Sequence, residues 1–129
     1  MAKILIVDDD DQLRTVLRAI LEQVGYDVID ADSGKKCLEL LRGGEKPDLI
    51  LLDVMMPELD GWETCRLIKE DPKIKDIKVA MLTVRSQDPD KVKTFGYATA
   101  NWHIAKPIDK ESFLETIKWI LAEPETADK

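Results

Sequence analysis

Short apolar runs alternate with amphipathic stretches along the chain, and this alternation limits the possible folds more than any other feature. Three of the runs are continuous: Ile4 to Val7, Leu49 to Leu52 and Val79 to Leu82. Such runs are typical of strands covered on both faces. Two weaker runs, Val28 with Ile29 and Ala100 to Ala105, complete the set. Apolar residues recur at helical spacing between the runs, so the pattern predicts strands and helices in turn.

The residues between these segments support the same division. Ser33, Asp60 and Asp109 stand where they can cap the starts of helices, and Gly25 and Pro72 stand where helices end. Repeated strand–helix units in one small α/β domain imply a parallel sheet with right-handed crossovers and helices on both faces.

The fourth predicted helix, roughly Asp88 to Tyr97, has the weakest amphipathic pattern. Its apolar stripe is little more than Val92 and Phe95, so we expect it to be held weakly. The length of 129 residues predicts a single domain, here residues 1–122, and residues 123–129 form a short polar tail.

Charge and composition argue against several classes of function. The chain has 26 acidic and 19 basic residues and a net charge of −7, which argues against direct binding to nucleic acid or to an anionic membrane. No apolar run approaches the roughly 20 residues needed to span a bilayer, and the N-terminus lacks the order of a signal peptide. A cytoplasmic protein is expected.

Several other residues are expected to be structural. Cys37 and Cys65 lack a CxxC partner and are predicted to be reduced core residues. Trp62 and Trp119 match helical faces and are predicted to pack. The remaining group consists of loop lysines expected to be solvated: Lys73, Lys75 and Lys78.

Acidic residues follow two of the predicted strands. Asp8 to Asp11 follow the first strand and Asp53 follows the third. Ligands of open parallel sheets bind beyond the carboxyl ends of the strands, where the strand order reverses. If these strands are neighbours, their carboxylates repel one another, and a bound divalent cation would offset the repulsion. Mg²⁺ is favoured over Ca²⁺ because a site with only a few carboxylates leaves room for the water ligands that Mg²⁺ keeps. A solvated helix start explains Asp10 and Asp11 without a function, whereas no helix begins directly after Asp53.

A hydroxyl group and an ammonium group are predicted at the same edge of the sheet. Thr83 ends the fourth apolar run, and Lys106 with Pro107 follows the fifth. Both groups suit a transferred phosphoryl group, because catalysis of that transfer is mostly positioning and charge neutralisation. Either residue alone is more often structural, so the prediction depends on four strand ends agreeing.

Four segments together resemble the signature of response-regulator receiver domains of bacteria and archaea, of the chemotaxis-regulator type. They are Ile4 to Asp9, the segment LLDVMMPELDG from Leu51 to Gly61, Leu82-Thr83 and Lys106-Pro107. The similarity covers about residues 3–121. It implies a doubly wound, flavodoxin-like fold with five parallel strands in the order 2-1-3-4-5 and five helices on both faces.

The resemblance also implies a role for each candidate site residue. Asp53 would accept the phosphoryl group. Asp8 and Asp9 would bind Mg²⁺ together with Asp53 and the backbone carbonyl of Met55. Thr83 would donate a hydrogen bond to the phosphoryl group and Lys106 would form an ion pair with it. The Lys106–Pro107 peptide bond would be cis.

The function that follows from this resemblance is a phosphorylation-activated switch of a two-component signalling system. The phosphoryl donor would be the phosphohistidine of a sensor histidine kinase or of a phosphotransfer domain. A downstream protein would bind the face around the fourth helix, fifth strand and fifth helix. The chain would catalyse its own phosphorylation and dephosphorylation slowly and would not be a conventional enzyme.

Several positions depart from the family pattern. His103 stands where the family usually has Tyr or Phe as a switch residue acting with Thr83, and its titration near neutral pH makes a pH-dependent output conceivable. Val84 replaces a small residue and could narrow the pocket. Met55 and Arg85 correspond to positions that tune dephosphorylation and could shield the acyl phosphate from water, so a phosphoryl lifetime of minutes or longer is expected.

Two other classes of function stay open. A haloacid dehalogenase-type phosphatase also uses an Asp nucleophile after a first strand, but the Thr or Val expected after its DxD motif is replaced here by Asp11, and a cap domain does not fit this length. The other class is a receiver-like adaptor that is not phosphorylated, and the intact set of acidic residues argues against it.

Overall fold

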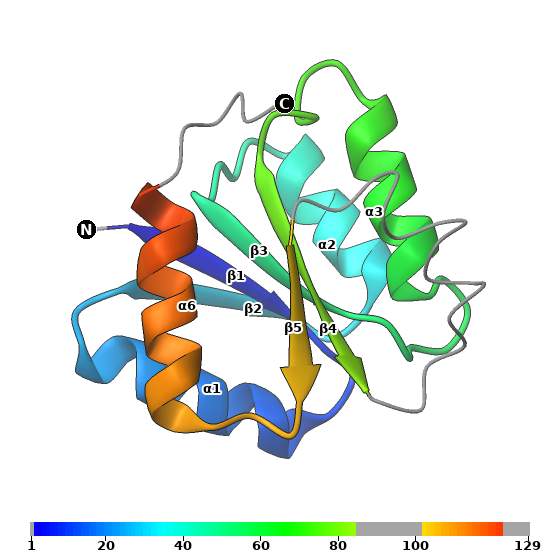
Figure 1. The fold of residues 1–129 in the computed structure, drawn as a ribbon. Coiled ribbons are helices and arrows are strands. Elements are labelled where there is room, and N and C mark those ends of the chain that lie inside the picture. Colours follow the sequence, from blue (N-terminus) through cyan, green and yellow to red (C-terminus); the bar gives the residue numbers. More distant parts are fainter. Residues whose placement is uncertain (1, 85–101, 123–129) are drawn as a thin grey trace.

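A computed structural model describes residues 2–84 and 102–122 of the chain (Figure 1). Five strands form one sheet: β1 (Lys3–Val7), β2 (Asp27–Ala31), β3 (Leu49–Asp53), β4 (Lys78–Val84) and β5 (Trp102–Lys106). Four helices occur in the described residues: α1 (Asp11–Gln23), α2 (Gly34–Arg42), α3 (Gly61–Glu70) and α6 (Lys110–Ala122). None of these helices is long and apolar enough to cross a membrane.

The strand order is β2-β1-β3-β4-β5, and every neighbouring pair is parallel. The predicted order is therefore confirmed. The chain passes from β1 to β2 on one side and then returns to β3 on the other side, so the order reverses between β1 and β3. In open parallel sheets, a crevice at the carboxyl ends of the strands marks this point.

Helices cover both faces of the sheet, as the continuous apolar runs predicted. Figure 1 shows α1 and α6 on one face and α2 and α3 on the other. Successive strand residues point to opposite faces, so Ile4 and Ile6 pack in the core with α1 and α6, and Leu5 and Val7 pack in the core with α2 and α3. Burial on both faces removes any need for alternating polar residues in the central strands.

Each predicted helix cap in the described residues is present. The side chains of Asp10, Ser33 and Asp60 accept hydrogen bonds from backbone N–H groups at the starts of α1, α2 and α3. Asp109 accepts one from the N–H of Ser112 in the first turn of α6, at 3.0 Å. Asp10 is thus explained by local structure, as expected.

Some predictions concern residues that the structure does not describe. The predicted fourth helix, roughly Asp88 to Tyr97, lies outside the described residues, as do Arg85 and the predicted tail at 123–129. Four of the five predicted helices are therefore seen in residues 2–84 and 102–122.

Lys78 is not the solvated loop charge that its neighbours suggested. Its side chain is buried, with 7% of the residue exposed, and its Nζ donates to the carbonyl oxygens of Ile120 at 3.0 Å and Leu121 at 3.4 Å. These carbonyls lie in the last turn of α6, where helix carbonyls lack intrahelical partners. A buried cation at this helix end satisfies them and opposes the negative end of the helix dipole.

The cysteine and tryptophan predictions are confirmed, although one tryptophan is largely exposed. Cys37 and Cys65 are free and buried, and burial raises the pKa of the Cys37 thiol to about 12, so it behaves as core. Trp62 is buried, but Trp119 is 56% exposed. The Trp119 ring meets Trp102 edge to face, with the ring centroids 6.5 Å apart, so it packs at the margin of the helix face.

Candidate functional site

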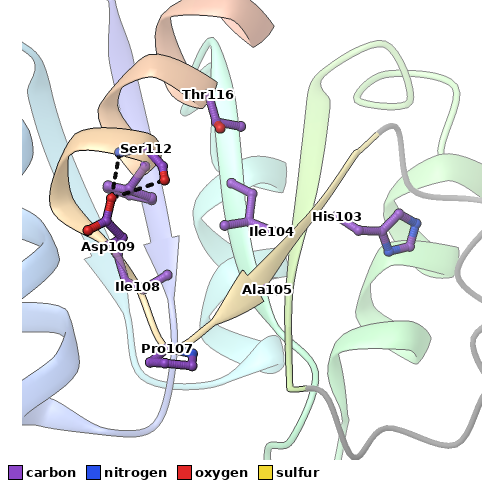
Figure 2. A pocket seen from close by; sticks show the side chains of 9 residues that line it. His103, Ile104, Ala105, Pro107, Ile108, Asp109, Ser112 and Thr116 are labelled. Carbon is purple, nitrogen blue, oxygen red and sulfur yellow. Dashed lines mark hydrogen bonds between the residues drawn. The ribbon is translucent and has the colours of Figure 1, made fainter.

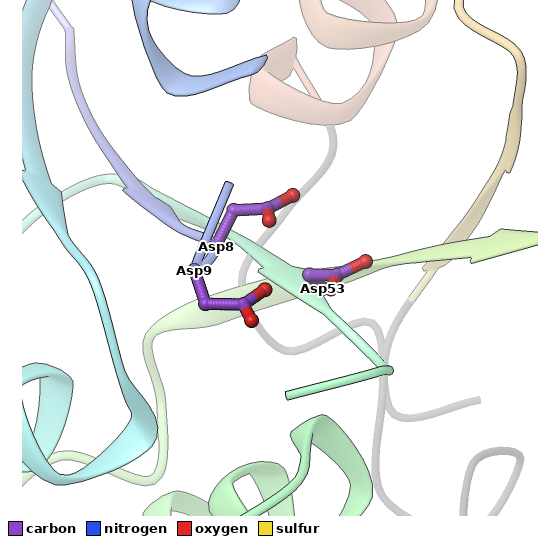
Figure 3. Close-up of side chains that lie close together, drawn as sticks. All are labelled: Asp8, Asp9 and Asp53. Carbon is purple, nitrogen blue, oxygen red and sulfur yellow. The ribbon is translucent and has the colours of Figure 1, made fainter. Parts of the chain in front are cut away.

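The reversal of strand order between β1 and β3 brings acidic residues together. Asp8 follows β1 directly and Asp53 is the last residue of β3. One carboxylate oxygen from each of Asp8, Asp9 and Asp53 lies within 4.8 Å of the other two, and Figure 3 shows the three side chains side by side. Asp8 and Asp53 are buried, at 1% and 4% exposed, while Asp9 is exposed. The predicted convergence of these carboxylates is confirmed.

Lys106 reaches the same cluster from the end of β5. Its Nζ lies 2.6 Å from Asp53 Oδ1, a short charge-assisted hydrogen bond, and 3.6 Å from Asp8 Oδ2. The Lys106–Pro107 peptide bond is cis, as the resemblance implied. One ammonium group therefore pairs with two of the three clustered carboxyl groups.

Burial governs the protonation of these groups. Burial raises the pKa of Asp8 and of Asp53, because desolvation disfavours a charged carboxylate, while the neighbouring Lys106 ammonium partly offsets the shift. Burial by itself lowers the pKa of Lys106, but its hydrogen bond to Asp53 and the charges of both buried carboxylates outweigh this, and the pKa is raised. The site holds more negative charge than Lys106 can neutralise.

One oxygen of Asp8 makes the site suitable for a divalent cation. Asp8 Oδ1 accepts a hydrogen bond from the Asp10 N–H at 2.9 Å. Asp8 Oδ2 is buried and accepts no hydrogen bond from any described residue. A buried oxygen of this kind, beside two further carboxylates, fits a hard cation with oxygen ligands, and Mg²⁺ binds through one or two carboxylates while keeping several waters.

Gly61, the first residue of α3, packs directly against the backbone of Asp53. The Gly61 N–H donates to the carbonyl of Val54 at 2.9 Å. A Cβ atom on Gly61 would lie 2.1 Å from the Asp53 carbonyl oxygen and 2.8 Å from the Val54 Cα. Only glycine fits this approach, so α3 supports the strand end that presents the Asp53 side chain.

Thr83 and Met55 lie at the same edge of the sheet as the acidic cluster. Thr83 is half-buried near the end of β4, next to Leu82, which is paired with Asp53. Met55 lies in the loop between β3 and α3, and it is 64% exposed. Both positions agree with the predicted roles, which remain predictions. Val84 ends β4.

His103 lies in β5, away from the carboxylates. Its ring faces Trp62 in α3, with the ring centroids 6.0 Å apart. Trp102 packs on the opposite face of the sheet against Trp119, as strand alternation predicted. Burial lowers the pKa of His103, which favours the neutral imidazole at neutral pH and limits a pH-dependent output to more acidic conditions. A switch role for His103 remains a prediction.

A separate groove of about 250 Å³ runs between β5 and α6 (Figure 2). Its lining includes His103, Ala105, Pro107 and Thr116. Asp109 is also on its wall, with its carboxylate held by the Ser112 cap hydrogen bonds. The groove belongs to the described part of the face on which we predicted a downstream partner.

One residue that contacts the site was not predicted from the sequence. Arg14 in α1 donates from Nη1 to the backbone carbonyl oxygen of Asp8 at 2.7 Å and also forms an ion pair with Asp11. The sequence does contain a weak signal, since Asp11 and Arg14 are spaced as an i,i+3 pair on the predicted helix. The contact with Asp8 depends on the turn between β1 and α1, which no periodic pattern describes.

Comparison with known proteins supports one family throughout. The sequence model of the response regulator receiver domain family matches residues 4–118, which include every candidate site residue. Protein PilH of Pseudomonas aeruginosa is 40% identical over 95% of this chain and 99% of its own length. The DNA-binding dual master transcriptional regulator RpaA of Synechocystis is 38% identical over 94% of this chain, but the match covers 49% of RpaA, so the chain spans about half of that relative.

A solved structure agrees with the sequence matches. The CheY-like response regulator receiver domain protein of Methanospirillum hungatei superposes with a TM-score of 0.81 at 34% identity, over 92% of this chain and 93% of that one. Members of the family are phosphoacceptor switches of two-component signalling and bind Mg²⁺ at an acidic pocket. With the family model, the relatives and the fold in agreement, this chain belongs to the response regulator receiver domain family.

Proposed function

We propose that Asp53 accepts a phosphoryl group from the phosphohistidine of a sensor histidine kinase or a phosphotransfer protein, and that the aspartyl phosphate changes the affinity for a downstream protein. One observation carries the proposal: Asp53 Oδ1 lies 2.6 Å from Lys106 Nζ, in a cluster with the carboxylates of Asp8 and Asp9. The comparisons give no support to a haloacid dehalogenase-type phosphatase or to an adaptor that is not phosphorylated.

In the transfer step, a carboxylate oxygen of Asp53 attacks the phosphorus atom of the donor. The new bond is O–P, and the bond that breaks is the P–N bond, whose electron pair leaves with the donor imidazole, which takes up a proton. Lys106 pairs with a phosphoryl oxygen and Thr83 donates a hydrogen bond to another. Both contacts neutralise charge that would otherwise oppose the reaction.

Asp8, Asp9, Asp53 and the backbone carbonyl of Met55 are the residues that would hold Mg²⁺. The fit is supported by the three converging carboxylates and by the buried Asp8 oxygen that accepts no hydrogen bond from a described residue. When bound, the cation supplies positive charge to the phosphoryl oxygens. Asp8 acts either directly or through a bound water.

The remaining features of the proposal concern the chain as a unit. We expect residues 1–122 to form the receiver domain and residues 123–129 to be a polar tail. Thr83 and His103 couple the phosphoryl group to the partner face, which includes β5, α6 and the predicted fourth helix, a segment that lies outside the described residues. Phosphorylation and dephosphorylation are self-catalysed and slow. We expect a cytoplasmic location.

A mass measurement tests the proposal. The intact chain is incubated with a small acyl phosphate donor, with and without Mg²⁺, and the protein mass is recorded. The wild type should gain one phosphoryl group only with Mg²⁺, and Asp53→Asn should gain none. Asp27→Asn, which removes the same charge from an exposed residue at the start of β2, should behave as wild type. Equal labelling of Asp53→Asn, or sustained turnover of phosphate esters, would overturn the proposal.

A further inference from the structure

We infer that Arg14 is a positioning residue for the Mg²⁺ site, acting through the backbone of Asp8. This inference rests on the proposed function and names a residue that supports it. Arg14 touches neither the reacting atoms nor the carboxylate oxygens of the acidic cluster. Its Nη1 instead donates to the Asp8 carbonyl oxygen at 2.7 Å, on the residue that contributes one of the clustered carboxylates.

Three hydrogen bonds from described residues hold Asp8, and Arg14 supplies one of them. The Asp8 N–H donates to the carbonyl of Ala31 at the end of β2, at 3.1 Å. Its Oδ1 accepts from the Asp10 N–H at 2.9 Å, and its carbonyl accepts from Arg14. Held in this way, Oδ2 stays buried beside the carboxylates of Asp9 and Asp53, with the Lys106 ammonium 3.6 Å away. Without the Arg14 bond, the Asp8 carbonyl loses its side-chain contact with α1, and the turn is tied to that helix through the Asp10 cap alone among the contacts that the structure describes.

The guanidinium group is itself well fixed. Its Nη2 pairs with the carboxylate of Asp11 and its Nε lies 3.5 Å from Asp30 Oδ2 in β2. Only 16% of the Arg14 side chain is exposed. A planar guanidinium presents several donors in a rigid fork, so one side chain ties the Asp8 backbone to the start of α1 and to β2. A lysine at this position could not reach all three partners at once.

The direction of the effect on Mg²⁺ affinity separates positioning from simple charge. Arg14 is a cation close to an acidic site, so as a charge it repels Mg²⁺, and its removal would tighten binding. As a positioning residue it holds the ligand turn in place, and its removal would weaken binding. The two explanations predict opposite changes for the same substitution.

Arg18, one turn further along α1, provides a matched control. Its Nη2 donates to the backbone carbonyl of Val28 at 2.9 Å, and its Nη1 lies 3.5 Å from the same Asp30 carboxylate that Arg14 approaches. Arg18 therefore has the same charge as Arg14, lies in the same helix, approaches the same acidic partner and likewise donates to a backbone carbonyl. It makes no contact with Asp8 or Asp9 in the described structure.

The test is calorimetric titration of the full chain with MgCl₂, with folding checked by circular dichroism. Arg14→Gln should raise the Mg²⁺ dissociation constant by about tenfold, in the range found when groups that orient metal ligands are lost. Arg14→Lys, which keeps the charge without the fork, should fall between that variant and the wild type. Arg18→Gln should bind Mg²⁺ as tightly as the wild type or more tightly.

Several results would overturn the inference. One is that Arg14→Gln binds Mg²⁺ as tightly as the wild type or more tightly. Another is that Arg18→Gln loses as much Mg²⁺ affinity as Arg14→Gln does. Should Arg14→Gln fail to fold, Arg14→Lys decides alone, and a wild-type affinity in that variant is the contrary result. If the wild type binds Mg²⁺ and is phosphorylated while Arg14→Gln keeps its Mg²⁺ affinity, only this inference is removed. A wild type that does neither removes the proposed function as well.

Discussion

Asp8 and Asp53 lose most of their contact with water on folding, and this burial raises the pKa of both carboxyl groups. A carboxyl group whose pKa is raised by folding binds more protons in the folded than in the unfolded state. The stability linked to it is present below its ordinary pKa of 3.8 and is lost as the pH rises through the folded-state pKa. At neutral pH, these site residues therefore reduce the stability of the metal-free protein, as functional groups commonly do.

This linkage predicts that Asp8→Asn stabilises the metal-free protein. In EDTA at neutral pH, the free energy of unfolding should rise by on the order of 1 kcal/mol, because a charge is removed from a buried cluster. The gain should shrink as the pH falls toward 3.8, where the wild-type carboxyl group becomes protonated as well. Urea unfolding across this pH range measures it. Asp10→Asn is the control, since Asn also caps helices and Asp10 is exposed; an equal gain there would contradict the prediction.

Met55 is expected to control how long the aspartyl phosphate survives. It lies two residues beyond Asp53, and its thioether side chain cannot orient a water molecule for attack. We expect a phosphoryl lifetime of minutes or longer in the wild type and a several-fold shorter one in Met55→Asn. Decay of the phosphorylated mass after removal of the donor gives both values. Loss of phosphate from the wild type within seconds would show that the shielding argument is wrong.

At the scale of elements, α3 is placed by the close approach of Gly61 to Asp53. Gly61→Ala should lower the free energy of unfolding by about 1–3 kcal/mol, because its Cβ would meet the Asp53 carbonyl oxygen at 2.1 Å. The rate of phosphorylation should fall with it, since the strand end must move. Gly43→Ala at the end of α2 is the control: its backbone is helical and its nearest contact is 3.1 Å, so a change within about 1 kcal/mol is expected. Equal effects at the two glycines would refute the argument.

The C-terminal turn of α6 depends on Lys78 at the start of β4. Lys78→Met removes the donor that satisfies the carbonyls of Ile120 and Leu121, and leaving such groups unsatisfied costs about 1–3 kcal/mol. Urea unfolding should show this loss, and hydrogen exchange should show earlier opening of the last turn of α6. Lys75→Met, at an exposed lysine of the preceding loop, should change stability by no more than about 0.5 kcal/mol. A loss of similar size in Lys75→Met would contradict the assignment.

For the whole molecule, excess acidity links ligand binding to stability. The chain carries a net charge of −7, and three of its carboxylates converge in one site. A ligand that binds only the folded state stabilises it by mass action. At a free Mg²⁺ concentration tenfold above the dissociation constant, the free energy of unfolding should rise by about 1.4 kcal/mol. Asp9→Asn should lose most of this gain, and thermal melting with and without Mg²⁺ measures it. A full gain in Asp9→Asn would exclude Asp9 as a ligand.

Most of the fold was predictable because it depends on local patterns of apolar and capping residues. Apolar runs and helical spacing mark which residues are buried, and Ser33, Asp60 and Asp109 mark helix starts because their short side chains accept hydrogen bonds from free backbone N–H groups. The acidic residues of the site were predictable for a similar reason, since Asp8 and Asp53 directly follow apolar runs whose carboxyl ends meet at one edge of a parallel sheet.

The sequence by itself determined the succession of strands and helices along the chain, the helix starts and the residues at the strand ends, because each depends on neighbours along the chain. Only the tertiary structure decided that Lys78 is buried, that Trp119 stays exposed, that Gly61 lies against Asp53 and that Arg14 holds the carbonyl of Asp8. These contacts join segments that come together only when helices pack on the sheet. Their energies depend on distances between atoms, which no pattern of residue types contains.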